Sequence, residues 1–348
     1  MRIKTIFRKC ICTYCACSYY PEFQIIVIIP TFLLYRFLDE TTTFNESSYE
    51  KVGIIFCISL ITFFVLNVIP GDVVAAMLGD FASKDAIEAA RAQMGLDVSL
   101  PMQYINWLKN ILTGNFGNSY FQRKAVLTLI VNAFKYTFTM AIAAYIVAII
   151  LGLLTGIFAA LYHDKLPDRI LMSISVFGIS APSFWIAIIL QIVAGLKLGW
   201  FPVSGIKSGI WWVLPAFSLG IRSAATIARV TRTSMLDVLK QDFIRTAYAK
   251  GLSKRRIIFV HALRNALVPI ITILGNDFGV LLTGSMITEN VFNIPGIGKL
   301  LIDAINRRDI PLVQGGVIYV AGICVIIYFI VDILYAVINP NIRLGGEK

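Results

Sequence analysis

The chain has 348 residues, of which 57% are hydrophobic and only 15% are charged, and its mean hydropathy is +0.77. This composition is far more apolar than that of a soluble domain, which it excludes. The net charge of +11 could indicate a nucleic-acid partner, but the basic residues lie between long apolar segments, which is typical of a positive-inside distribution. The sequence therefore predicts an all-α polytopic membrane protein.

Residues 1–50 form an atypical N-terminal extension. Its apolar run at 23–34 is shorter than the about 20 residues that a membrane span requires, so the extension is predicted to be either disordered or an extra hydrophobic segment. Thiolates bind zinc, but closed zinc sites use two separated pairs of ligands, and four closely spaced cysteines are a weak candidate. We assign no metal and no cofactor to this cluster, which consists of Cys10, Cys12, Cys15 and Cys17.

Six apolar segments follow, and they are predicted to span the membrane at about residues 52–69, 136–161, 170–198, 213–230, 266–287 and 316–338. The segment at about 71–130 is a long extracytoplasmic loop, because long loops are translocated largely regardless of charge. Trp107 and Phe116 in this loop suit either a membrane interface or a small core of the loop itself. Placing the basic segment 233–263 inside puts both termini in the cytoplasm, unless 23–34 also spans and moves the N-terminus outside.

Glycine and proline residues mark the second and third spans. Gly152 and Gly156 are four residues apart, which would let another helix approach closely. The third span is interrupted around Pro182, and such a break frees backbone groups that must be satisfied by protein or by a wet cavity. Pro182 is therefore a candidate pathway residue, although a simple packing kink explains it equally well.

Charged residues lie inside the fourth and fifth spans. Arg222 is near mid-depth, and Arg229 follows seven residues later on the same helix face. Asn276 and Asp277 are near the middle of the fifth span, so Asp277 is the natural group to compensate Arg222. Such charges must face protein or water, and both a structural ion pair and a substrate-facing role remain open.

A polar and basic segment, Thr233–Pro269, stands between the fourth and fifth spans. The helical spacing of its apolar residues predicts one amphipathic helix that runs to about Lys250, with Ser234 as a candidate capping residue; the apolar residues are Leu236, Leu239, Phe243 and Ala247.

Beyond Lys250 the sequence predicts a tight turn and a second helix. Gly251 predicts a left-handed helix end, Leu252 can fold back on the first helix, and Ser253 can cap the second, which runs through 254–256. Pro269 then marks the approach to the bilayer, because proline kinks or breaks a helix.

The run Arg245-Thr246-Ala247-x-x-x-Gly251, continuing to His261-Ala-Leu-Arg264-Asn265-Ala-x-x-Pro269, resembles the EAA loop of bacterial ATP-binding-cassette importer permeases, the inner-membrane components of binding-protein-dependent transport systems. It is most similar to the B-type dipeptide/oligopeptide subfamily. The general signature has glutamate and alanine at Arg245 and Thr246, but the peptide branch itself carries Arg-Thr-Ala. The endings Ile69-Pro-Gly-Asp72 and Glu289-x-x-Phe292-x-x-Pro295-Gly296-x-Gly298 are also similar to the family, so the resemblance covers about residues 52–343; Asn339-Pro340 replaces the usual Asp-Pro.

This resemblance implies a six-helix type I importer transmembrane domain at 51–343, followed by a cytoplasmic tail at 344–348, in the bacterial inner membrane. It implies as partners a second homologous permease, two cytosolic ATPase subunits and an extracytoplasmic solute-binding protein. The implied substrates are di- or oligopeptides, with a nickel or other metal chelate or glutathione as the alternative. The loop would dock on an ATPase as the coupling helix, through Arg245, Thr246, Ala247, Lys250, Gly251, Leu252, Ser253 and Arg255.

The sequence contains no motif for catalysis or for phosphate binding. It lacks G-x-x-x-x-G-K-[ST], G-x-S-x-G and H-E-x-x-H, and its two histidines, His163 and His261, lie at predicted membrane boundaries. The chain is therefore predicted not to be an enzyme, and the energy for transport must come from a partner.

Four other interpretations compete with the importer. The basic loop could bind anionic lipid by charge alone, whereas a helix-turn-helix DNA reader is excluded by the flanking spans. A secondary ion-coupled transporter, with Asp277 and Asp332 as ion sites, is the competing class of function. An intramembrane enzyme has no candidate residues.

Overall fold

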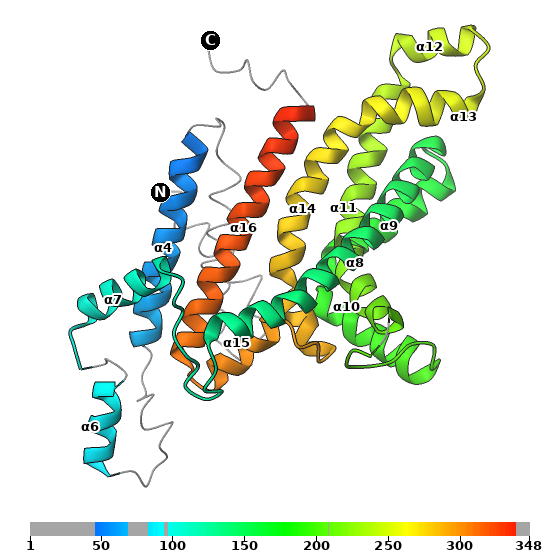
Figure 1. Ribbon diagram of the computed structural model, residues 1–348. Coiled ribbons are helices and arrows are strands. Elements are labelled where there is room, and N and C mark those ends of the chain that lie inside the picture. The colour runs from blue at the N-terminus through cyan, green and yellow to red at the C-terminus, as the bar shows by residue number, and fades with distance from the viewer. Residues whose placement is uncertain (1–45, 69–82, 94–96, 208, 339–348) are drawn as a thin grey trace, which may run out of the picture. The chain divides into compact units, whose positions relative to one another are not determined.

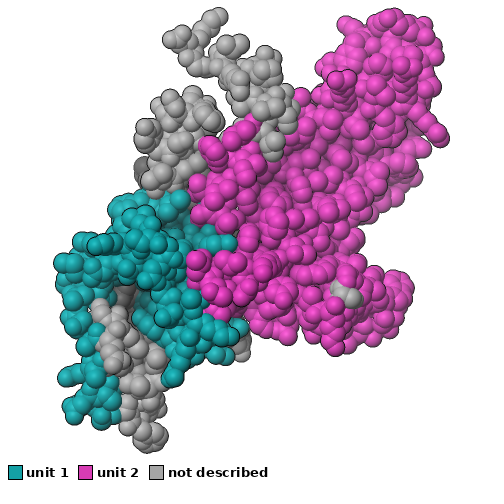
Figure 2. Space-filling model, in the orientation of Figure 1, with its two compact units in different colours: residues 1–126, 302–321 teal, residues 127–301, 322–348 magenta. Residues whose placement is uncertain are grey.

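The computed structural model describes residues 46–68, 83–93, 97–207 and 209–338. All its regular elements there are helices, apart from one β-bridge between Asn118 and Ala125 (Figure 1). The prediction of an all-α protein is thus confirmed for these described ranges. The chain divides into two compact units, and Figure 2 colours them separately: unit 1 comprises 1–126 and 302–321, and unit 2 comprises 127–301 and 322–348. The cysteine cluster lies outside the described residues.

Unit 1 contains α4 (Glu46–Val68), α6 (Lys84–Gln93) and α7 (Leu100–Leu112). An aromatic cluster joins α4 to α7, because the ring centroid of Phe63 lies 5.2 Å from that of Tyr104 and 5.8 Å from that of Trp107. The hydroxyls of Ser59 and Tyr104 share a buried hydrogen bond of 2.8 Å. Trp107 thus packs against α4, which lies outside the loop, and the two environments considered for this residue stay predictions.

A buried carboxylate fixes the loop that precedes α8 within unit 1. Asp309, between α15 (Ile297–Asn306) and α16 (Ile310–Ile338), is almost fully buried. It accepts hydrogen bonds from the Ser119 hydroxyl and, at 3.2 Å, from the backbone N–H of Tyr120. A buried charge needs such partners to offset its lost hydration.

Unit 2 is a stack of long helices around α11. In chain order its elements are α8 (Val126–Leu161), α9 (Leu166–Ser180), α10 (Ser183–Leu190), the π-helix η2 (Gln191–Lys197), the 3₁₀-helix η3 (Gly209–Trp212), α11 (Val213–Leu239), α12 (Asp242–Ala249), α13 (Lys254–Arg256), the π-helix η4 (Ile257–Ala262) and α14 (Leu263–Val291). α11 packs against α9, α10 and α14. It is therefore the central helix of the unit.

Four helical segments in the described residues are long and apolar enough to cross a membrane: Val126–Leu161, Gly209–Leu239, Lys254–Leu282 and Ile310–Val331. The pair Leu166–Ser180 and Ser183–Lys197, bent by 107°, makes a fifth if it is one span. Several helices are longer than the apolar runs suggested, since α8 begins at Val126 and α11 ends at Leu239. The span predicted at 52–69 lies on α4, where the apolar helix found among the described residues, Ile55–Phe64, is shorter than a membrane span, so this span stays a prediction.

The break predicted around Pro182 is present between α9 and α10. The Ala181 N–H donates to the Phe177 carbonyl at 2.9 Å, and the Pro182 carbonyl accepts from the N–H groups of Trp185 and Ile186 at 3.1 and 3.2 Å. These backbone groups are satisfied within the chain, so the break by itself requires no wet cavity. A pathway role for Pro182 stays a prediction.

Glu289 organises the turn between α14 and α15. Its fully buried carboxylate accepts hydrogen bonds from the N–H groups of Gly298, at 2.7 Å, and Lys299, at 3.4 Å, and from the Ser285 hydroxyl at 3.1 Å. A side chain at Gly296 would collide with this carboxylate. The glycine-rich segment that follows Glu289 thus brings the Glu289 carboxylate to the N-terminus of α15, where the helix dipole favours a negative charge.

The predicted glycine pair is a helix-packing site, and its partner is α11. A Cβ atom at Gly156 would lie 2.6 Å from the Ala228 carbonyl oxygen, and one at Gly152 would lie 2.7 Å from the Ile227 Cβ. On the other side of the contact, a Cβ at Gly220 would lie 2.6 Å from the Ala144 carbonyl oxygen. The prediction that another helix approaches these glycines closely is confirmed.

Gly156→Ala is expected to destabilise the protein by about 1–3 kcal/mol, because one methyl group forces α8 and α11 apart. The matched control is Gly322→Ala, where a Cβ meets nothing within 4 Å; there the better helix propensity of alanine is expected to be neutral or stabilising by up to about 1 kcal/mol. The thermal unfolding midpoint of the detergent-purified protein measures both, and equal shifts in the two variants would contradict the packing argument.

Candidate functional site

α12 and α13 stand at one end of unit 2 (Figure 1). The prediction of one amphipathic helix through this region is wrong, because α11 ends at Leu239 and α12 begins at Asp242, after Gln241 in an extended conformation. Ser234 lies inside α11 and is buried, so it caps nothing. The break shifts the helical register, and Ile244, 1% exposed, is buried in place of Phe243, which is 38% exposed.

The end of α12 is the glycine turn that the sequence predicted. Gly251 has φ +70°, in the left-handed region. Its N–H donates to the Tyr248 carbonyl at 3.0 Å, and the Leu252 N–H donates to the Ala247 carbonyl at 3.3 Å. This pair of bonds is the Schellman motif, in which glycine is preferred because it has no Cβ. Ser253 precedes α13 in the N-cap position with extended dihedrals, but its side chain makes no capping hydrogen bond.

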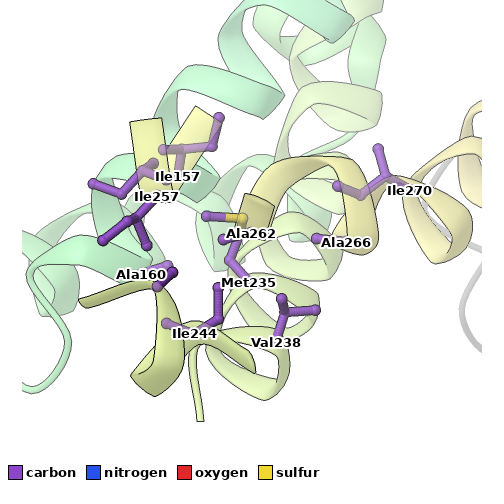
Figure 3. Close-up of a cluster of buried hydrophobic side chains, with 11 residues drawn as sticks. Ile157, Ala160, Met235, Val238, Ile244, Ile257, Ala262, Ala266 and Ile270 are labelled. Atoms are coloured by element: carbon purple, nitrogen blue, oxygen red, sulfur yellow. The ribbon is translucent and has the colours of Figure 1, made fainter. Parts of the chain in front are cut away.

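A cluster of buried apolar side chains holds α12 against the rest of unit 2 (Figure 3). Ile244 and Ala247 point inward from α12, and Leu252 is half-buried against the same cluster. The cluster draws on the ends of α8, α11 and α14 and on η4, so α12 is attached to four helices at once. Its other members are Ile157, Ala160, Met235, Val238, Ile257, Ile258, Ala262, Ala266 and Ile270.

The opposite face of α12 and its turn is exposed, basic and partly aromatic. Tyr248 is 49% exposed, and the exposed Arg245 and Asp242 form only a 3.3 Å surface ion pair. Of the predicted coupling residues, Ala247 and Leu252 face the cluster. The others are exposed, namely Arg245, Thr246, Lys250, Gly251, Ser253 and Arg255.

A polar clamp that the sequence did not reveal joins the first turn of α9 to α11. Asp168 accepts two hydrogen bonds from Arg232, from Nε at 2.6 Å and from Nη2 at 2.7 Å, and one from the Asp164 N–H at 3.0 Å. The side chains of Asp168 and Arg232 are 3% and 23% exposed. His163, Asp164 and Asp168 are close enough to bind a metal ion. Arg232 already occupies the buried carboxylate, however, and we assign no metal.

The polar residues predicted within spans are not joined by an ion pair. Arg222 and Arg229 are exposed on α11, whereas Asn276 and Asp277 are half-buried on α14. The charge of Arg222 attracts the Asp277 carboxylate, but no ion pair links the two side chains. One carboxylate oxygen of Asp277, Oδ2, is buried with no hydrogen-bond partner.

Comparison with known families decides the identity of the chain. Residues 152–344 match the model of the family "binding-protein-dependent transport system inner membrane component", and residues 46–141 match the model of the N-terminal region of such membrane components. The chain belongs to this family. A permease of this kind is a transmembrane component of the inner membrane and not an enzyme, in line with the missing catalytic motifs. The resemblance of the loop at 245–269 to such permeases is thereby confirmed.

Two curated relatives show how similar this permease is to known ones. It is 41% identical over 317 residues to a di/tripeptide transport system permease of Pseudomonas aeruginosa, with 83% of this chain and 94% of the relative covered. It is 40% identical over 289 residues to a glutathione transport system permease of Escherichia coli strain K12, with the same coverage. Among solved structures, a chain of the MetNI methionine ABC transporter matches with a TM-score of 0.49 and 15% identity, covering 64% of this chain and 98% of that one.

Removing one partner of the clamp is expected to cost more than removing both. Arg232→Gln leaves the Asp168 carboxylate buried and unpaired, which should destabilise the permease by about 1–3 kcal/mol. In the double variant with Asp168→Asn the buried group is neutral, so part of that loss should be recovered. Thermal unfolding of the four proteins of this cycle measures the interaction, and strictly additive effects would show that the clamp contributes nothing.

Proposed function

We propose that this permease forms half of the translocation pathway of an ATP-driven importer of di- or oligopeptides. It pairs with a second homologous permease, binds two cytosolic ATPase subunits and receives solute from an extracytoplasmic binding protein. The observation that carries the proposal is the attachment of α12, whose inner face is locked into four helices while its outer face is free. The names of the two curated relatives support a peptide as solute, and glutathione or a metal chelate is the alternative.

The attachment of α12 gives a mechanism for coupling. Close-packed side chains transmit displacement, because they cannot be compressed. A movement of α12 therefore moves the ends of α8, α11 and α14 together, through the cluster around Ile244 and Ile257. ATP-driven closure of the ATPase subunits moves α12 as a rigid body and switches the pathway between its inward-facing and outward-facing states.

Two features set this proposal apart from the competing interpretations. Anionic lipid needs only positive charge, whereas the turn at Gly251 and the inward side chains give α12 one defined orientation. A secondary transporter depends on an ion gradient instead of ATP. Transport that continues without ATP and stops when the ion gradient collapses would favour that class and give Asp277 the central role.

Gly251→Val is expected to uncouple ATP hydrolysis from transport, because a β-branched residue in the left-handed region costs about 1–2 kcal/mol and disrupts the turn after α12. A Cβ at this position meets nothing within 4 Å, so the backbone is the sole cause of strain. Gly251→Asn is the matched control, because asparagine tolerates this region, and it should keep most of the coupling. The measurement is the amount of solute imported per ATP hydrolysed in proteoliposomes. Normal coupling in the valine variant would contradict a role of the turn at Gly251 in coupling.

Tyr248→Ala is expected to weaken the recovery of ATPase subunits with the tagged permease by about tenfold, as exposed aromatic residues often dominate interfaces. The permease itself should stay folded, because Tyr248 lies outside the apolar cluster. Tyr136→Ala, on α8, removes a similarly exposed tyrosine away from α12 and should change nothing. Co-purification from the native membrane with mass spectrometry and an ATPase assay measures both. Recovery of the permease alone, active without ATP, would overturn the importer assignment.

A further inference from the structure

α11 carries a polar stripe on the face that unit 2 does not cover. The stripe begins at Arg222 and runs toward α12 at intervals of four, three, four and four residues, which places its members on one side of the helix. The remaining faces of α11 pack against α8, α9 and α14. All members of the stripe are exposed except Thr226, which is partly exposed, and they are Arg222, Thr226, Arg229, Thr233 and Asp237.

The charges of this stripe lie in a helix that is apolar enough to span the membrane, within Gly209–Leu239. A guanidinium group facing lipid is costly, so such a residue faces water or a partner group. Among the described residues, Arg229 forms no ion pair, and Arg222 is only attracted by Asp277. The hydroxyls of Thr226 and Thr233 donate to the backbone carbonyls of Arg222 and Arg229, at 3.3 and 3.0 Å, and no hydrogen bond to either guanidinium group accompanies these bonds.

A second polar face lies on α14, which packs along α11. Asn265, Thr272 and Asn276 follow one another at intervals of seven and four residues, the spacing of one helix side. Asn265 and Thr272 are exposed, and Asn276 is half-buried. Asn265 and Thr272 donate to carbonyls of their own helix, so it is the charged groups of α11 that require water or a partner group beside these two packed helices instead of lipid.

We propose that Arg222 and Arg229 line the solute pathway and hold a carboxylate of the solute in succession as it moves along α11. This inference rests on the proposed import function. A guanidinium group is the side chain best suited to bind a carboxylate, through two parallel hydrogen bonds. Seven residues of helix separate the two arginines by about 10 Å, which is about the length of an extended tripeptide. A solute with one carboxylate thus moves by about its own length when that group passes from the first arginine to the second.

The acid at the end of the stripe adds a direction to this arrangement. Asp237 lies at the end of the stripe nearest α12 and is exposed. Its negative charge repels a carboxylate and so favours release at that end of the pathway. A metal chelate with net positive charge would meet the opposite pattern, with repulsion at the two arginines. The stripe therefore selects for solutes that carry a free carboxylate, as every unmodified peptide does.

The experiment places a thiol between the two arginines. In a chain whose native cysteines are replaced, Thr226→Cys is introduced and the complete importer is prepared in membrane vesicles. The thiol is treated with 2-carboxyethyl methanethiosulfonate, an anion, or with 2-(trimethylammonio)ethyl methanethiosulfonate, a cation. The rate at which each reagent modifies the thiol at position 226 is divided by the rate at which the same reagent modifies a free thiol in solution. The anionic reagent is expected to react roughly three- to tenfold faster by this measure, as expected for attraction by a partly hydrated charge.

Variants then assign the attraction to the stripe. Arg229→Gln should bring the ratio of the two rates close to one, and Arg229→Lys should restore it, because lysine keeps the charge. Arg169→Gln removes an exposed arginine that lies on α9 and should leave the ratio unchanged. An excess of trialanine, delivered with the binding protein and ATP, should slow the anionic reagent in the parent chain and less so in Arg229→Gln.

Two results would overturn the inference. A thiol at position 226 that neither reagent modifies would show that the stripe is covered, for example by the second permease, and a ratio that Arg229→Gln does not change would show that the arginines attract no anion. ATP-dependent uptake of trialanine by the Thr226→Cys parent is measured in the same vesicles. If the unsubstituted importer also takes up no trialanine with ATP, the result counts against the proposed function itself. This outcome is distinct from the two results that would overturn the inference about the arginines.

Discussion

The structure of unit 2 depends on the burial of two isoleucines, Ile244 on α12 and Ile257 on η4, in one apolar cluster. Full burial of such a side chain stabilises by about 1.5–3 kcal/mol, and α12 has only eight residues with which to secure itself. Isolated helices of this length are not stable in water. α12 therefore exists because its inner face is seated between helix ends, and the same contacts make it a rigid projection from the helices that it would move.

Polar groups stabilise the two ends of unit 2 in different ways. At the turn after α14, the buried Glu289 carboxylate is held by backbone N–H groups at the start of α15. Near α12, the Asp168 carboxylate is held by the Arg232 side chain. Backbone donors are fixed in place by the helix that they begin, whereas a side-chain pair can form and break as helices slide. A sliding movement of α9 against α11 would therefore break the bonds of Arg232, whereas the bonds of Glu289 would persist for as long as α15 keeps its first turn.

Local signals in the sequence predicted what local physics determines. Gly251 has the left-handed conformation expected of a helix-ending glycine, and Gly152 and Gly156 mark a close helix contact. The predicted register of α12 failed, because the helical pattern was continued from Leu239 through the break at Lys240 and Gln241. A break of two residues rotates every later position, so Ile244 took the place of Phe243 in the core. Asp242 in the first turn of α12 is the one local signal of a new helix start there.

Other features of the structure could not be predicted from the spacing of residues along the sequence. Asp168 and Arg232 are separated by 64 positions and meet only because α9 packs on α11. The π-helical turns at η2 and η4 fall in ordinary apolar sequence, and their extra residue per turn depends on tertiary contacts. Arg222 and Asp277 were predicted to pair because both lie near the middle of their spans. Membrane depth does not determine toward which neighbour a side chain points, so the pairing could not be predicted from it.

The exposed arginines of α11 require water or a partner group on the side that unit 2 leaves uncovered. A folded membrane protein buries or hydrates its charges, yet Arg222 and Arg229 stand uncovered in a segment apolar enough to span the bilayer. Under the proposed import function, water held in the pathway hydrates these two arginines. The one buried carboxylate oxygen of Asp277 without a partner lies on the neighbouring helix α14. Among the described residues of unit 2, the buried polar groups without a partner therefore lie on α11 and α14. These two helices also pack on α12 through the apolar cluster, so a movement of α12 acts directly on the helices proposed to contact solute.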